Sequence, residues 1–245
     1  MVKRNILIVI ILTVISAVVW GRFNFKTPEY GAPPYDTEET QLQDNDEVPN
    51  FANWKRPDGP IRVGLQAGHW KNAELPDELE RIRGNGGTTG RGVPEWQVNL
   101  NIAEETAKIL RAEGIEVDIL PATVPPQYLA DAFVSIHADG STSPSSRGFK
   151  VAAPRRDLTQ RANELVTILE NTYGRAVNMP LDPNVTRNMR GYYAFSWRRF
   201  NHAIHPMTPA VILETGFLTN PTEAKLLINN PEIPAKALAT ALIDF

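Results

Sequence analysis

The sequence predicts an α/β fold in three layers, α/β/α, with helices on both faces of a twisted, mainly parallel sheet. From residue 61 onward, short apolar runs typical of buried strands alternate with segments whose apolar residues recur at helical spacing. One of these runs, "FVSIHA" at 133–138, is apolar enough to be buried on both faces, which is typical of a parallel strand. The chain has 245 residues, of which 42% are hydrophobic, and this is enough for one such domain.

Each strand and helix has its own local signal. The expected strands are "IRVGLQA" (61–67), "IEVDIL" (115–120), "DAFVSIHA" (131–138), "GFKVAA" (148–153) and "PAVILE" (209–214). The expected helices cover residues 94–113, 158–173, 221–229 and 232–245. The first helix has the strongest pattern, because Pro94 stands in its first turn, Gly114 follows its end, and leucines and alanines recur on one face between them.

The first 60 residues have a different composition from the rest. Lys3 and Arg4 precede an apolar run at 6–20, so we interpret residues 1–21 as a signal anchor that leaves the following chain outside the cytoplasm. No small-x-small cleavage site follows the run, which favours an uncleaved transmembrane helix over a cleaved, secreted form. Residues 22–60 are rich in proline and acidic residues, which predicts a disordered linker before a catalytic domain at 61–245.

Composition excludes two classes of protein. The formal net charge of −3 provides no broad basic surface, so we expect no nucleic-acid partner. The absence of cysteine means that an exported domain has to fold without disulfide bonds.

Four acid or imidazole side chains stand where a parallel sheet collects its ligands. His69, His137 and Glu214 each end a predicted strand, and the carboxyl ends of parallel strands meet at one edge. Glu95 opens the first helix, where a carboxylate is also favoured by the helix dipole alone. Two imidazoles and one carboxylate with an open fourth position are the ligand set of a catalytic zinc site, and a further carboxylate can act as its base.

Four motifs occur in a characteristic order. They are "AGH" at 67–69, "GVPEWQVNLNIA" at 92–103, "FVSIHADG" at 133–140 and "ETGFLTN" at 214–220. On these motifs the chain resembles, over roughly residues 61–245, the zinc-dependent N-acetylmuramoyl-L-alanine amidases of the type 3 class, which hydrolyse peptidoglycan. The resemblance implies that His69, Glu95 and His137 hold Zn²⁺ and that Glu214 is the general acid/base. The reaction it implies is hydrolysis, by zinc-activated water, of the amide bond between N-acetylmuramic acid and the L-alanine of the stem peptide.

The first motif departs from that family. The family commonly has "DPGHGG", whereas Gln66 and Ala67 stand here before the Gly-His pair and Trp70 follows it. We therefore expect an altered cleft at these three positions. Trp70 either stacks on the sugar or peptide or covers the core.

A basic and aromatic segment, "VTRNMRGYYAFSWRRF" at 185–200, is unusual in a chain of net negative charge. Arg187 and Arg190 are candidates for pairing with the carboxylates of stem peptides, with tyrosines and a tryptophan along the glycan. The alternative is a partly buried element with solvated arginines.

Two further features are interpreted without a catalytic role. His202 and His205 form an H-x-x-H pair, but Pro206 breaks any helix there, so we expect structural or cleft-lining histidines. The glycine-rich loop at 84–92 lacks the Gly-Lys-Ser/Thr ending of a nucleotide site. We expect its glycines to let the backbone approach the metal and the substrate closely.

The leading hypothesis is a membrane-tethered zinc amidase of the bacterial cell envelope, with peptidoglycan as substrate. The alternatives are a catalytically inactive wall-binding relative and a zinc peptidase that cuts within the stem peptide. The first is less favoured because all four residues are kept, and the second because it leaves "ETGFLTN" unexplained. The sequence identifies no protein activator and no oligomeric state.

Overall fold

A computed structural model describes residues 51–245. The segment interpreted as a signal anchor, 1–21, and the linker up to residue 50 lie outside the described residues. Within residues 51–245, none of the helices combines the length and the apolar character needed to cross a membrane.

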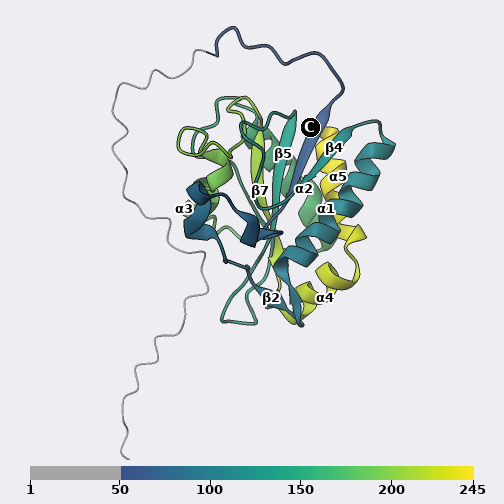
Figure 1. Ribbon diagram of the computed structural model, residues 1–245. Coiled ribbons are helices and arrows are strands. Elements are labelled where there is room, and N and C mark those ends of the chain that lie inside the picture. Colours follow the sequence, from purple (N-terminus) through teal and green to yellow (C-terminus); the bar gives the residue numbers. More distant parts are fainter. Residues whose placement is uncertain (1–50) are drawn as a thin grey trace, which may run out of the picture.

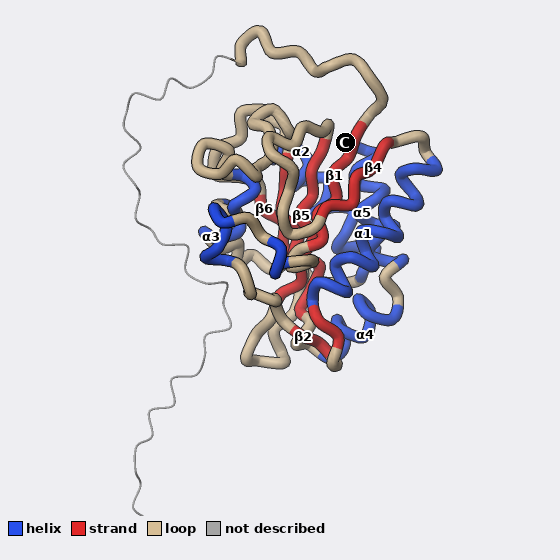
Figure 2. The backbone as a smooth tube through the Cα atoms, in the orientation of Figure 1, coloured by secondary structure: helices blue, strands red, loops and turns tan. Residues whose placement is uncertain are grey.

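A five-stranded sheet forms the centre of the described part of the chain, in the order β4-β1-β5-β7-β6 (Figure 2). The strands are β1 (Arg62–Ala67), β4 (Glu116–Leu120), β5 (Ala132–Asp139), β6 (Lys150–Ala152) and β7 (Ala210–Phe217). All pairings are parallel except that of β6, which lies at the edge and runs antiparallel to β7. A separate two-stranded sheet joins β2 (Thr89–Gly90) to β3 (Val93–Pro94). The prediction of a mainly parallel sheet is confirmed.

Long helices cover one face of this sheet. They are α1 (Glu95–Ala112), α2 (Ala162–Val177), α4 (Pro221–Asn229) and α5 (Glu232–Asp244). Helix α1 packs on β1, β4 and β5, α2 packs on β6 and β7, and α5 contacts both helices (Figure 1). Helix α2 begins four residues later than the pattern predicts, because the Asp157 carboxylate accepts hydrogen bonds from the backbone N–H groups of Thr159 and Ala162 and holds a turn there.

The other face carries only short helices. They are the 3₁₀ helices η1 (Asn72–Glu74), η2 (Asp77–Ile82) and η3 (Tyr193–Phe195), and the one-turn helix α3 (Arg187–Arg190). The expected second layer of helices is therefore reduced to single turns and loops. The physical reason is that segments 121–131 and 178–209, which cross this face, contain several prolines and lack a helical apolar period.

Side chains alternate between the two faces, and this decides where polar groups can stand. In β5, Val134 and Ile136 belong to the core under the long helices, whereas Phe133 belongs to the core on the other face. Because a strand has a period of two, Ser135 and His137 lie on the same face as Phe133. The face that lacks long helices therefore carries the polar side chains near the end of β5.

Residues 51–60, the end of the predicted linker, contact the domain. The Arg56 guanidinium pairs with Asp131, with a bond of 2.8 Å to Oδ2, just before β5 begins. Phe51 and Trp54 pack on the His205 ring, with ring centroids 5.7 and 6.1 Å away. The chain thus enters the domain at the amino ends of β1 and β5, opposite the carboxyl ends of these strands. His205 has a structural role here, as expected.

A buried carboxylate joins the end of the sheet to α4. Glu223 accepts hydrogen bonds from the backbone N–H groups of Gly148 (2.7 Å) and Phe217 (2.8 Å), and it is 5% exposed. We expect Glu223→Ala to lower the free energy of unfolding by about 3 kcal/mol, because two buried donors lose their partner. Chemical denaturation measures this loss. The control is Glu104→Ala at an exposed position of α1, and an equal effect of both substitutions would contradict the prediction.

Candidate active site

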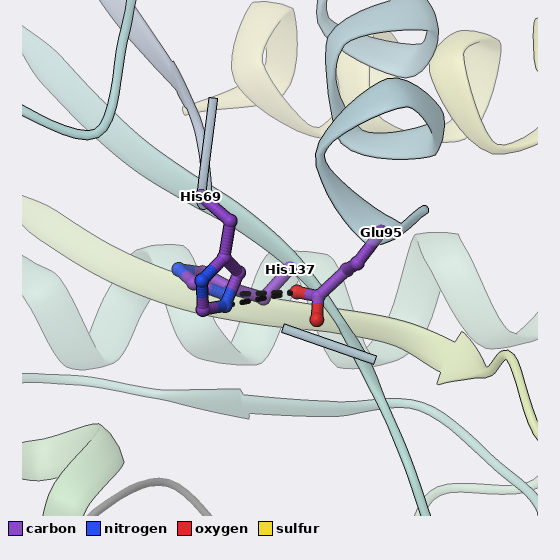
Figure 3. Close-up of side chains that lie close together, drawn as sticks. All are labelled: His69, Glu95 and His137. Atoms are coloured by element: carbon purple, nitrogen blue, oxygen red, sulfur yellow. Dashed lines mark hydrogen bonds and ion pairs between the residues drawn. The ribbon is translucent and has the colours of Figure 1, made fainter. Parts of the chain in front are cut away.

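Three predicted metal ligands come together at the carboxyl edge of the sheet (Figure 3). His69 lies in the turn that follows β1, Glu95 is the first residue of α1, and His137 lies in β5. One ligand atom from each lies within 4.8 Å of the others. The structure therefore brings together residues that are up to 68 positions apart in the chain, counting from 69 to 137.

The carboxylate of Glu95 stands between the two imidazoles. Its Oε1 atom is 3.1 Å from Nδ1 of His137 and 3.5 Å from Nε2 of His69. The two rings lie nearly perpendicular, at 84°, with their centroids 4.9 Å apart. The three side chains thus converge on one small volume, as Figure 3 shows.

The backbone around Glu95 fixes its carboxylate. Pro94 precedes it at the start of α1, so Glu95 stands in the first turn, where the helix dipole favours a negative charge. Oε2 accepts a hydrogen bond from the N–H of Thr88 (2.9 Å), and Oε1 accepts one from the N–H of Ala138 (3.1 Å). The Asn99 amide, one turn later on the helix, also donates to Oε1 at 3.2 Å. These three hydrogen bonds fix the position of the carboxylate. The donors are uncharged, so the carboxylate keeps its net negative charge.

A backbone carbonyl fixes the orientation of His69. The Nδ1 atom lies 2.6 Å from the carbonyl oxygen of Asn85, and because that oxygen can only accept, Nδ1 carries the proton. Nε2 is then the unprotonated nitrogen, and it faces Glu95. The Asn72 amide donates to the same Asn85 carbonyl and to that of Ile82, so η1 supports the loop that orients His69.

Two glycines allow this close approach. A Cβ atom on Gly68 would lie 2.4 Å from the His137 ring, and one on Gly87 would lie 2.2 Å from Oε2 of Glu95. Gly87 also has φ = 71°, which other residues rarely adopt. The glycine-rich loop thus comes close to two of the predicted metal ligands, Glu95 and His69, at Gly87.

The protonation states suit a metal. Burial opposes ionisation of Glu95, but the charge that His69 and His137 carry when protonated, together with hydrogen bonds from His137 and the N–H of Thr88, lowers the pKa of Glu95 to about 2. Burial is also the main reason that the pKa of His69 is lowered. An ionised carboxylate and a neutral imidazole are the forms that bind a metal cation.

An unpartnered nitrogen of His137 also indicates a metal site. Nε2 of His137 is buried and has no hydrogen-bond partner among residues 51–245. An unpartnered buried nitrogen is costly, and the cost is removed when the ring binds a cation. The cluster of His69, Glu95 and His137 therefore fits a divalent metal ion.

Glu214 lies directly beside this cluster. It is the neighbour of His137 on β5 and of Lys150 on β6, so the three side chains form a row across adjacent strands. Burial, together with the carboxylates of Asp139 and Glu95, raises the pKa of Glu214 well above that of an ordinary glutamate, and the charge of Lys150 opposes this only in part. Glu214 can therefore hold a proton in conditions where a solvent-exposed glutamate has lost it.

One cavity of about 340 Å³ connects these groups. It is lined by His69, Glu95, His137 and Glu214, the four residues expected to carry the chemistry. Further lining comes from apolar side chains, such as Leu75 and Ile82, and from the charged side chains of Asp139 and Lys150. The lining of the cavity thus combines apolar and charged side chains with the metal cluster.

Sequence reasoning missed the ion pairs of Lys150, which lines the cavity. Lys150 is 5% exposed, and its ammonium group forms ion pairs with Asp139 (2.7 Å) and Asp182 (2.8 Å). Asp182 is 32 positions beyond Lys150, counting from 150 to 182, so no local spacing marks this pair. The available signal was a lone lysine inside the apolar strand "GFKVAA".

The three residues expected to bind substrate lie outside the cavity lining. Arg187 and Arg190 are exposed on α3, whereas Asn188 of the same helix lines the cavity. Trp70 is half-buried, with the ammonium group of Lys71 5.2 Å from its ring centroid.

The H-x-x-H histidines also lie outside the cavity lining. His202 pairs with Glu78 of η2 through Nδ1 at 2.7 Å, and His205 packs on the aromatic side chains of the docked segment 51–60. Neither joins the metal cluster.

Curated proteins with similar sequences are amidases by name. The chain is 28% identical over 185 residues to N-acetylmuramoyl-L-alanine amidase AmiA of Escherichia coli (strain K12), covering 58% of this chain and 64% of that protein. It is 32% identical over 179 residues to N-acetylmuramoyl-L-alanine amidase AmiC of Neisseria meningitidis serogroup B, covering 56% of this chain and 43% of that protein. The matched regions thus span less than two thirds of the length of either relative.

Solved structures show the same fold. The catalytic domain of the amidase CwlV from Bacillus (Paenibacillus) polymyxa var. colistinus matches with a TM-score of 0.52 at 20% identity, covering 75% of this chain and 97% of that one. The amidase AmiC2 of Nostoc punctiforme matches with a TM-score of 0.53 at 20% identity, covering 77% of this chain and 98% of that one. At these identities the similarity supports the fold.

A family model covers most of the chain. Residues 63–244 match the model Amidase_3, described as N-acetylmuramoyl-L-alanine amidase, and this range contains the metal cluster and Glu214. The chain therefore belongs to the Amidase_3 family of N-acetylmuramoyl-L-alanine amidases.

Proposed function

We propose that this chain is a zinc-dependent N-acetylmuramoyl-L-alanine amidase. Its substrate is bacterial peptidoglycan, and it hydrolyses the amide bond between N-acetylmuramic acid and the L-alanine of the stem peptide. The observation that carries this proposal is the cluster of His69, Glu95 and His137 beside Glu214, in one cavity of a domain that belongs to this family.

The proposed zinc ligands are His69, Glu95 and His137. When bound, zinc supplies a Lewis acid that polarises the scissile carbonyl and makes water a nucleophile near neutral pH. The side chains of the protein hold the ion and leave room for the substrate. The choice of zinc rests on the two-imidazole, one-carboxylate donor set, which is common in catalytic zinc sites.

The proposed general acid/base is Glu214. Two observations support this role: Glu214 pairs in register with His137 on the neighbouring strand, and it lines the same cavity as the three proposed ligands. It accepts a proton from the attacking water and returns it to the amide nitrogen as the bond to L-alanine breaks. A raised pKa suits this role, because the same group has to take up a proton and then release it.

The proposed domain organisation places the enzyme in the cell envelope. Residues 1–21 anchor the chain in the cytoplasmic membrane, 22–60 form the linker, and the catalytic domain from residue 61 lies outside; cleavage after the anchor would release a secreted form. The contacts of Phe51 and Arg56 support this arrangement, since the linker then reaches the domain at the edge opposite the cavity. The cavity thus lies at the edge of the sheet opposite the docked residues 51–60.

For the substrate, we propose that Arg187 and Arg190 bind carboxylates of the stem peptide beyond the scissile bond. Both are exposed on α3, which contributes Asn188 and Met189 to the cavity lining. Trp70 lies outside the lining, so we propose no contact between it and the scissile bond.

The decisive experiment is digestion of purified sacculi with and without a chelator. We expect release of free stem peptides with an L-alanine amino terminus and an intact glycan, and loss of this activity after chelation that is restored by zinc. Products cut within the stem peptide would indicate a peptidase instead. Zinc binding without any release would indicate a catalytically inactive wall-binding protein.

The role of Glu214 is tested by Glu214→Gln. We expect one zinc ion to remain bound while turnover falls by a factor of about 10² to 10⁴, the usual contribution of a general acid/base. Zinc content by elemental analysis and product release from sacculi measure the two effects, with Glu104→Gln on the exposed side of α1 as control. Loss of zinc from Glu214→Gln would mean that Glu214 is a ligand.

The role of the arginines on α3 is tested by replacing both Arg187 and Arg190 with alanine. We expect KM for peptidoglycan fragments to rise about tenfold with little change in kcat, since the lost ion pairs bind substrate and transition state alike. Arg198 and Arg199, also exposed, provide the matched double-alanine control. An unchanged KM would refute the binding role.

A further inference from the structure

Gln66 is a buried amide with all its hydrogen-bonding capacity in use. Its side chain is 0% exposed and lies on β1. Nε2 donates to the carbonyl of Ala122 (2.9 Å) and to the hydroxyl of Tyr193 (2.8 Å). Oε1 accepts from the hydroxyls of Ser135 (2.7 Å) and Tyr192 (3.0 Å). Two donor and two acceptor sites are all that a primary amide offers, so the geometry of the group is fully determined.

The position of Gln66 in the sheet explains its reach. Gln66 pairs in register with Ser135 on β5, and Ser135 is two residues before His137 on the same face. The amide therefore lies on the same face of the sheet as His137, at the level of the side chain that precedes His137 on that face. From this point it accepts a hydrogen bond from the hydroxyl of Tyr192, whose side chain lines the cavity.

Tyr192, which is hydrogen-bonded to Gln66, also contacts the ring of the proposed metal ligand His137. Its ring packs edge-on against the His137 ring, with centroids 5.6 Å apart and an interplanar angle of 82°. On its other sides Tyr192 contacts the rings of Tyr193 (4.8 Å) and Phe195 (5.6 Å). Nδ1 of His137 lies 3.1 Å from Oε1 of Glu95, whereas Nε2 has no hydrogen-bond partner within residues 51–245, so the packing of Tyr192 adds a second constraint on the plane of that ring.

We propose that Gln66 is a positioning residue for the metal site: through the hydroxyl of Tyr192 it sets the orientation of the His137 ring. An amide is needed for this, because only an amide donates to Ala122 and Tyr193 while it accepts from Tyr192 and Ser135. An aspartate, common at this place in the family, can only accept when ionised. The inference depends on the metal binding in the proposed function but not on the identity of the substrate.

Measurement of zinc affinity tests the proposal. On the full-length purified protein, competition with a chromogenic chelator gives the dissociation constant of zinc. We expect Gln66→Met, which keeps the volume but removes all four hydrogen bonds, to weaken zinc binding by about 10- to 100-fold, the usual effect of losing an outer-shell partner. Tyr192→Phe, which keeps the ring and loses only its hydroxyl, should weaken it less.

The matched control is Tyr128→Phe. Tyr128 belongs to the same core as Tyr192 and also loses a hydroxyl bond, at 2.7 Å to Asp118, but it does not line the cavity. We expect it to lower the melting temperature without changing zinc affinity. In the double variant of Gln66 and Tyr192, the two losses of zinc affinity should not add, because they break the same connection.

The outcomes separate this inference from the proposed function. If Gln66→Met or Tyr192→Phe binds zinc as tightly as Tyr128→Phe, the inference is overturned, and Tyr192→Phe decides alone should Gln66→Met fail to fold. A wild-type chain that binds no zinc overturns both. A wild-type chain that binds zinc but releases no stem peptides refutes the amidase function, while a weaker affinity in the variants still supports the positioning role.

Discussion

The site depends on one buried negative charge. Glu95 is 3% exposed, and two imidazoles, three N–H donors and the start of α1 surround its carboxylate and offset the cost of burying its charge. A charge buried in this way is costly unless a cation or hydrogen bonds compensate it. The backbone approaches these groups closely at two glycines, Gly68 beside His137 and Gly87 beside Glu95. The carbonyl of Asn85 orients the His69 ring.

The two faces of the sheet differ in the side chains that they carry. The face under α1, α2 and α5 is packed mainly with apolar side chains, whose burial stabilises the domain. The other face combines apolar packing with two rows of polar side chains across neighbouring strands. One row is Gln66 and Ser135; the other, nearer the carboxyl end of β5, is His137, Glu214 and Lys150. Short turns and loops cover this face, and they leave the cavity that long helices would have filled.

Much of the fold was predictable because it rests on local patterns. The strands and long helices appear where apolar periodicity, Pro94 and Gly114 indicate them. The reduced helical layer was not predicted, because an α/β alternation does not say how the segments at 121–131 and 178–209 cross the sheet. The antiparallel β6 was likewise not predicted, since strand direction depends on a pairing partner that lies far away in the chain.

The sequence by itself determined which residue types end the strands, and so it identified His69, Glu95, His137 and Glu214 as candidates. Only the tertiary structure brought three of them within 4.8 Å, and only it revealed the ion pairs of Lys150 and the four bonds of Gln66. The physical reason is that a strand or a helix start is specified by neighbours in the chain. A buried amide or ammonium is specified by partners that arrive from distant segments, and these are unknown until the sheet has formed.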